Sequence, residues 1–179
     1  MLRTDDTALV IIDVQGKLAT LMHEREELYR NLVILVRGAL ILELPVLWLE
    51  QYPEGMGPTI PELAQLLTDQ EPMAKLSFSG CGLEEFQQRL EDSGRRKVLA
   101  AGIEAHICVC QTVCDLIVAG YGVEVVADAV SSRTVANRQV GLDKMARAGA
   151  GITSVETALF ELLREAGTPQ FKEIARLVK

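Results

Sequence analysis

The sequence predicts an α/β fold of three layers, in which helices cover both faces of a central, mainly parallel sheet of six strands. Three observations support this prediction. Short apolar runs alternate along the chain with amphipathic segments of helical period. The first run, ALVIID at 8–13, is apolar throughout, as expected for a strand buried on both faces. A chain of 179 residues can form one sizeable core, so we expect a single domain over 1–179.

The first half of the chain contains two clear strands. After the strand at 8–13, the segment 24–42 has the apolar periodicity of a long helix. The run PVLWLE at 45–50 is the second expected strand, and Pro45 lies at its entrance, where a missing N–H is harmless. Proline and glycine in QYPEGMGPTIPEL, from residue 51 to residue 63, exclude regular structure and predict a functional loop above the sheet.

The second half alternates between helix and strand, although the third of the six strands has no clear pattern. The runs KVLAAG and GVEVVAD have the length and apolar character of buried strands, and amphipathic segments separate them. The expected strands lie at 97–102, 122–128 and 151–153. The expected helices lie at 83–92, 106–119, 135–148 and 155–166.

In such Rossmann-like sheets, ligands bind in the crevice beyond the carboxyl ends of the strands. The residues that directly follow the apolar runs are therefore the ones to inspect for function. They are Asp13 and Gln15, the segment 50–52, the segment 102–108 and the segment 128–133.

Charge and hydropathy exclude two classes of partner. The formal net charge is −7 and the sequence pI is about 4.9, whereas nucleic-acid binding needs clustered lysine and arginine. No apolar run approaches the roughly 20 residues that span a bilayer, and the first residues lack the features of a signal peptide. We therefore expect a soluble, cytoplasmic protein that binds neither nucleic acid nor membrane.

Four cysteines, Cys81, Cys108, Cys110 and Cys114, raise the question of a thiol nucleophile. Their C-x-C-x3-C spacing matches no common zinc pattern, and disulfides are rare in the cytoplasm. Cys110 and Cys114 share one face of the expected helix, which favours buried structural thiols. Cys108 lies in the first turn of that helix, where unpaired N–H groups and the helix dipole favour a thiolate.

Three other residues bear on the role of Cys108. Asp13 closes a buried strand, so it is either a turn residue or a carboxylate at the functional edge. Lys75 lies in a mixed polar and apolar segment and is either solvated or a charge partner of Asp13 and Cys108. His106 lies two residues before Cys108, a spacing that points the two side chains to different faces of a helix.

Three motifs together resemble the isochorismatase-like cysteine hydrolases. They are IIDVQ at 11–15, KLSFS at 75–79 and GIEAHICV at 102–109, and the resemblance covers essentially the whole chain. EQYPEGMGPTIPEL and VADAVSSR look especially like the branch called isochorismatase domain-containing proteins. The fold that this resemblance implies is the isochorismatase-like hydrolase fold.

The resemblance implies a catalytic triad of Asp13, Lys75 and Cys108. It also implies a cis peptide bond between Ile103 and Glu104, which turns the Glu104 N–H toward the same point as the N–H of Cys108. The two N–H groups would form an oxyanion hole. The candidate pocket residues are Gln15, Leu18, Gln51, Tyr52, Phe78 and His106.

The sequence departs from its relatives at the pocket. It contains only two histidines, His23 and His106, and neither follows the second strand, so we expect no nicotinamidase-type metal and no cofactor. Glu104, Ala105 and His106 stand where relatives often have a small residue, Thr and Asp. The segment 16–18 lacks the aromatic residue that stacks on planar substrates in relatives.

These residues together predict a metal-independent cysteine hydrolase that cleaves a C–N bond of a small amide, ureido or related compound through a Cys thioester. One alternative is vinyl-ether hydrolysis, in which protonation by Asp13 matters and the thiol does not. A second alternative is a degenerate member of the family that acts as a binding or scaffold protein. A redox protein is disfavoured because the chain lacks C-x-x-C.

The resemblance also implies a homo-oligomer. Phe171, Ile174 and Leu177 follow one another at intervals of three and can form an apolar stripe near the end of the chain. This stripe either contacts a second copy of the chain or packs on the chain's own core.

Overall fold

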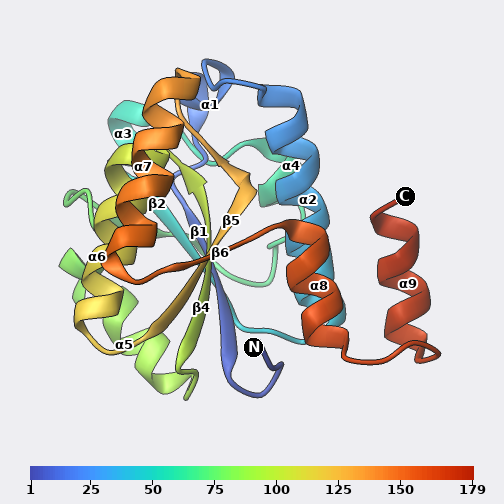
Figure 1. The fold of residues 1–179 in the computed structure, drawn as a ribbon. Helices are drawn as coiled ribbons and strands as arrows, with labels where there is room; N and C mark the ends of the chain where they lie inside the picture. The colour runs from blue at the N-terminus through green and yellow to red at the C-terminus, as the bar shows by residue number, and fades with distance from the viewer.

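The computed structural model describes residues 1–179, and its centre is a six-stranded sheet in which every pair of neighbouring strands is parallel (Figure 1). The strand order is β3-β2-β1-β4-β5-β6. The strands are β1 (Thr7–Ile12), β2 (Val46–Gln51), β3 (Met73–Lys75), β4 (Lys97–Ile103), β5 (Gly122–Ser131) and β6 (Gly151–Thr153). The predicted parallel sheet of six strands is confirmed.

Helices cover both faces of the sheet, which completes the predicted three layers. Figure 1 shows α2, α8 and α9 on one side and α5, α6 and α7 on the other. The helices are α1 (Gly16–Thr20), α2 (Arg25–Ile41), α3 (Pro53–Met56), α4 (Pro61–Ala64), α5 (Glu84–Asp92), α6 (Cys110–Val118), α7 (Val135–Ala148), α8 (Val155–Leu163) and α9 (Pro169–Leu177). A 3₁₀ turn, η1 (Gly80–Gly82), and a π-helical turn, η2 (Ala105–Val109), complete the elements.

Strand β1 separates two hydrophobic cores. Because successive side chains of a strand point to opposite faces, Leu9 and Ile11 enter the core under α2 and α8, whereas Val10 and Ile12 enter the core under α5, α6 and α7. All four side chains are fully buried. Burial on both faces explains why this strand is apolar at every position.

Several boundaries differ from the sequence-based expectation. The segment 51–63, expected to be irregular, contains the one-turn helix α3 and the start of a second, α4. Each has proline at the helix start, where a missing N–H breaks no helical bond. Strand β5 continues to Ser131, three residues beyond its expected end, and α8 ends at Leu163. The sequence pattern located neither α1 nor β3, because five and three residues are too few to show a period.

The apolar stripe near the end of the chain packs on the chain itself. Ile174 is fully buried in the core that α2 and α8 share, and the Phe171 ring packs edge-on against Phe160 with ring centroids 6.1 Å apart. Of the two alternatives for this stripe, the structure therefore shows packing within the chain. None of the helices has the length and hydropathy needed to cross a membrane.

Strands β1 and β4 approach each other closely where they end. Gly102 pairs with Ile12 and has a φ of +125°. A Cβ atom at Gly102 would lie 2.1 Å from the Ile12 carbonyl oxygen, which is backbone and cannot rotate away. Only glycine combines this φ with this distance, so Gly102 sets the spacing of the two strand ends.

We predict that Gly102→Ala destabilises the protein by about 3 kcal/mol or prevents folding, because it adds both backbone strain and a steric clash. Denaturant unfolding followed by circular dichroism measures the change. Gly122→Ala is the matched control in a strand, since its Cβ would meet its nearest neighbour, Lys97 Cγ, at 3.5 Å. Equal stability of the two variants would contradict the prediction.

Candidate active site

The three residues of the expected triad meet at the carboxyl edge of the sheet. Asp13 directly follows β1, Lys75 is the last residue of β3, and Cys108 lies in η2, just after β4. The chain builds the sheet outward from β1 in one direction and from β4 in the other, so β1 and β4 flank the switch point of the topology. Ligands of open α/β sheets bind at this point.

Lys75 forms a buried ion pair with Asp13. Its Nζ lies 2.7 Å from Asp13 Oδ2, and each residue is only 3% exposed. Three further acceptors surround Nζ: Gln51 Oε1 at 2.8 Å and the carbonyl oxygens of Ser77 and Phe78 at 3.2 and 3.1 Å. An ammonium has three donors for these four acceptors and no lone pair to offer. Lys75 is therefore a fixed cation and not a solvated surface lysine.

Asp13 has one occupied and one free carboxylate oxygen. Oδ2 accepts the bond from Lys75, whereas the buried Oδ1 has no hydrogen-bond partner. Burial raises the pKa of the Asp13 carboxyl, and the nearby charge of Lys75 opposes that rise. Asp13 also has a φ of 54°, which is uncommon for a residue other than glycine and is typically retained where function requires it. Its free oxygen can accept a proton.

Cys108 is a protonated thiol in its resting state. Burial and the negative charge of Asp13 raise the pKa of Cys108 to about 12, although Lys75 acts in the opposite direction. The expectation that a helix N-terminus leaves Cys108 with a lowered pKa is wrong, because Cys108 is only 8% exposed and its desolvation dominates. The charge of Asp13 is felt at the Cys108 thiol, so the two groups are neighbours.

A buried threonine joins the segment after Lys75 to the turn that carries Cys108. The Thr112 hydroxyl donates to the Cys108 carbonyl oxygen at 2.7 Å and accepts from the Gly80 N–H at 2.9 Å. Thr112 is fully buried in α6. This contact fixes the distance between two segments that lie far apart in the sequence.

The peptide bond between Ile103 and Glu104 is cis. The Glu104 N–H that follows it donates no hydrogen bond to another group of the chain. The Glu104 carboxylate, which is buried, accepts from Arg133, from the backbone N–H at 3.0 Å and from Nε at 3.2 Å. The backbone at Glu104 therefore has a free donor beside Cys108, while its side chain is held by Arg133.

Two of the candidate pocket residues, Gln15 and Leu18, contact the chain's own backbone or core. Gln15 is fully buried, and its side-chain amide bonds only the backbone of Gln51 and Gly57. Leu18 packs against the core under α2. The assignment of Gln15 to the pocket is therefore wrong, because its side chain is bonded to backbone and has no exposed surface. Leu18 is only partly buried, and its place in the pocket stays a prediction.

The other four candidates lie closer to the solvent. The side chains of Tyr52 and Phe78, near Lys75, are 51% and 55% exposed. His106 is half-buried, and its Nδ1 lies 3.0 Å from Ser132 Oγ. Gln51 bonds Lys75, a contact that its position directly after the apolar part of β2 did not reveal. Tyr52, Phe78 and His106 remain candidates for contact with a substrate.

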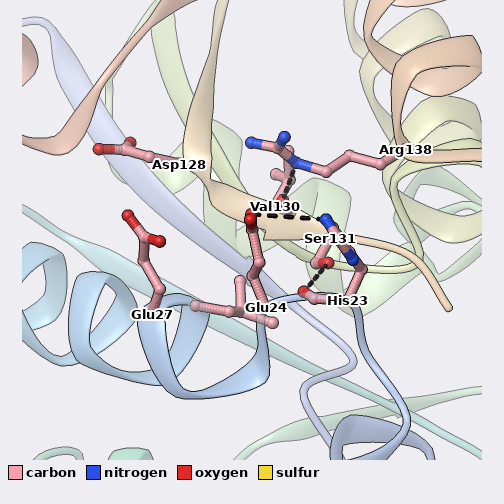
Figure 2. A pocket seen from close by; sticks show the side chains of 8 residues that line it. His23, Glu24, Glu27, Asp128, Val130, Ser131 and Arg138 are labelled. Carbon is pink, nitrogen blue, oxygen red and sulfur yellow. Dashed lines mark hydrogen bonds and ion pairs between the residues drawn. The ribbon is translucent and has the colours of Figure 1, made fainter. Parts of the chain in front are cut away.

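A small cavity near the end of β5 is distinct from this site (Figure 2). Its volume is about 40 Å³, room for little more than a water molecule. It is lined by His23, Glu24, Glu27, Leu28, Asp128, Val130, Ser131 and Arg138. Ser131 Oγ donates to the His23 carbonyl oxygen, and Arg138 Nε donates to that of Val130. No group of three or more His, Cys, Asp or Glu side chains in the chain is arranged to hold a metal ion.

The chain is similar to known proteins over most of its length. The family described as Isochorismatase domain matches residues 7–157. The secreted isochorismatase effector Isc1 of Phytophthora sojae (strain P6497) is 38% identical over 178 residues, which cover 97% of this chain and 84% of that protein. Isochorismatase domain-containing protein 2 of Macaca fascicularis is 42% identical over 146 residues, which cover 81% of this chain and 69% of that protein.

A solved structure is similar in both fold and sequence. The structure of MAR1 ribonuclease from Caenorhabditis elegans has a TM-score of 0.93 and 35% identity, and the match covers 99% of this chain and 91% of that one. The family match spans the segment from β1 to the start of α8, and so it includes Asp13, Lys75 and Cys108. The resemblance seen in the sequence is confirmed: the chain belongs to the isochorismatase family and is an isochorismatase-like hydrolase.

Proposed function

We propose that the protein is a metal-independent cysteine hydrolase that cleaves a C–N bond in a small amide, ureido or related compound. One observation carries this proposal: the buried Oδ1 of Asp13 has no hydrogen-bond partner while Lys75 occupies Oδ2, and the neutral Cys108 thiol lies close enough to Asp13 for the carboxylate charge to raise its pKa. A free carboxylate oxygen next to a neutral thiol is the arrangement that a general base needs to generate a nucleophile. The three residues form the proposed catalytic triad.

The first half of the proposed reaction is acyl transfer to Cys108. Asp13 Oδ1 takes the thiol proton as Sγ attacks the carbonyl carbon, and negative charge develops on the carbonyl oxygen. The N–H groups of Glu104 and Cys108 stabilise that oxygen, and the free N–H of Glu104 supports this role. Asp13 then returns the proton to the leaving nitrogen. The C–N bond breaks, an amine or ammonia departs, and a thioester remains on Cys108.

The second half is hydrolysis of the thioester. Asp13, ionised again, accepts a proton from a water molecule as the water oxygen attacks the thioester carbonyl carbon. The C–S bond then breaks, the thiolate takes the proton from Asp13, and the acid product leaves. Lys75 keeps its hydrogen bonds to four acceptors and balances the charge of Asp13 in each step.

Vinyl-ether hydrolysis is the second candidate, and one observation favours it. Burial raises the pKa of Asp13, so its acid form is more available than that of an ordinary aspartate. Protonated Asp13 could transfer its proton to the alkene carbon of an enol ether, after which water adds to the cation. This reaction does not use the Cys108 thiol.

Nucleic-acid cleavage has less support in this chain, although the C. elegans relative is named a ribonuclease. The formal net charge of −7 disfavours a polyanionic substrate. A binding or scaffold role does not require the buried ion pair of Asp13 and Lys75, and so has less support. Homo-oligomer formation and cytoplasmic location remain predictions, and one relative is named as a secreted effector.

We predict that small amides or ureido compounds acylate Cys108. The protein is incubated with a panel of such compounds, quenched in acid and measured by intact mass, and the expected result is an adduct of the acyl mass. Cys108→Ala should remove the adduct, whereas Cys110→Ala should retain it. Turnover of an enol ether by Cys108→Ala, with no adduct on the wild type from any amide, would instead support the vinyl-ether reaction.

We predict that iodoacetamide labels Cys108 faster than the other cysteines at pH 7, and only because Asp13 removes its proton. With a pKa of about 12 against about 11 for Cys81, Cys108 has about one-tenth as much free thiolate. Asp13→Asn removes the proton acceptor and should slow the labelling of Cys108 about tenfold or more, although loss of the Asp13 charge also lowers the pKa of Cys108. The labelling of Cys81 should not change, as measured by peptide mapping. An unchanged labelling rate of Cys108 in Asp13→Asn would contradict activation by a general base.

We predict that Lys75→Met lowers turnover about a hundredfold or more and destabilises the protein by about 3 kcal/mol at pH 8, because it leaves Asp13 buried without its cation. Loss of Lys75 raises the already raised pKa of Asp13 further. The penalty therefore applies at high pH and shrinks as the pH falls and Asp13 becomes neutral. Denaturant unfolding at pH 5 and pH 8 measures this loss of stability. Lys17→Met is the control, because Lys17 is exposed. A pH-independent loss would refute this explanation.

A further inference from the structure

We propose that Gln51 is a positioning residue that holds the Lys75 ammonium against Asp13 Oδ2, and so keeps Asp13 Oδ1 free for the thiol of Cys108. This inference rests on the proposed cysteine hydrolase function and adds a residue that acts through Lys75. The sequence suggested that Gln51 lines the pocket. Its hydrogen bonds indicate a different role.

The side-chain amide of Gln51 is fixed at both ends. Oε1 accepts from Lys75 Nζ at 2.8 Å, and Nε2 donates to the Leu76 carbonyl oxygen at 2.8 Å. The reverse orientation would set the NH₂ group against an ammonium and the amide oxygen against a carbonyl, and neither pair can form a hydrogen bond. The two partners therefore select one orientation, which presents an acceptor to Lys75.

The backbone of Gln51 is fixed as well, by a second glutamine. Gln15 Oε1 accepts from the Gln51 N–H at 2.6 Å, and Gln15 Nε2 donates to the Gln51 carbonyl oxygen at 3.2 Å and to that of Gly57 at 2.8 Å. Gln15 lies two residues after Asp13 on the same strand end. The end of β1 thus holds the end of β2, and the side chain at the end of β2 holds the last residue of β3.

Removal of Gln51 would leave Lys75 with partners that position it less well. The carbonyl oxygens of Ser77 and Phe78 belong to the segment after β3, where Leu76 and Phe78 are 78% and 55% exposed. The lysine side chain has a flexible four-carbon stem, so Nζ could follow this segment away from Asp13. Asp13 would then keep its desolvation and lose part of its compensating charge, which raises its pKa further.

The neutrality of Gln51 matters as much as its acceptor. Glu50, the preceding residue, is buried, and its charge already contributes to the raised pKa of Asp13. Its Oε1 is bound by the N–H and hydroxyl of Thr59 at 2.6 and 2.7 Å. A carboxylate at 51 would bind Lys75 but add another negative charge near Asp13 and Cys108. An amide supplies the acceptor without that charge.

The test is the pH dependence of Cys108 labelling by iodoacetamide. The rate should rise as Asp13 ionises, so the acid side of the profile reports on Asp13. In Gln51→Met the pH at which the labelling rate rises should move up by about half to one unit. At a pH below that midpoint, labelling should then be about three- to tenfold slower than in the wild type. In Gln51→Ser the new side chain is polar but too short to reach Lys75, so the labelling profile should shift in the same direction. A merely structural residue would lower thermal stability without moving the profile.

Gln88→Met is the control, because the Gln88 amide also forms a side-chain hydrogen bond, to Asp92 Oδ1 at 2.8 Å, but on the exposed side of α5. Its profile should match the wild type. The inference is overturned if Lys75→Met shifts the profile and neither Gln51 variant does. If Lys75→Met leaves the profile unchanged as well, the proposed hydrolase mechanism fails and this inference fails with it.

Discussion

The buried ion pair of Lys75 and Asp13 is the constraint on which the candidate site depends. Removing two charges from water is expensive, and the cost is offset only when the pair has good geometry and its remaining hydrogen-bonding capacity is used. The ammonium meets this condition, with four acceptors within 3.2 Å. The carboxylate does not, because Oδ1 has no partner. This unpaired oxygen of Asp13 is the atom of the site that is free to accept a proton.

The topology of the sheet explains how three distant residues reach this point. Parallel strands place their carboxyl ends at one edge, and β1 lies between β2 and β4 at the centre of the sheet. Lys75 belongs to β3, two strands from Asp13 in the sheet order, so only a long side chain can bridge the distance across β2. The turn η2 is held from its outer side by α7, where the absent Cβ of Gly141 would lie 2.5 Å from the Ala105 carbonyl oxygen. Close packing on both sides thus fixes Cys108.

Sequence patterns predicted the layers and the central strands because burial on two faces demands long apolar runs. They could not locate β3, since three residues with one exposed member have no period, yet this strand supplies Lys75. The convergence of Asp13, Lys75 and Cys108 was implied by family resemblance and not by spacing. Gln15 was misassigned because a polar residue at a strand end can turn toward a ligand or toward backbone, and only the three-dimensional contacts distinguish these.

The pKa of Cys108 was also misjudged, and the reason bears on how the site works. A helix N-terminus and a lysine each favour a thiolate, but desolvation and the charge of Asp13 outweigh them. A permanently ionised thiol beside Asp13 would place two negative charges together in a buried site. Keeping the proton on sulfur avoids this repulsion until a carbonyl is in place to receive the electrons. In the proposed mechanism, reactivity then depends on the substrate, and the Asp13 oxygen that is unpaired at rest would become the proton acceptor when the substrate binds.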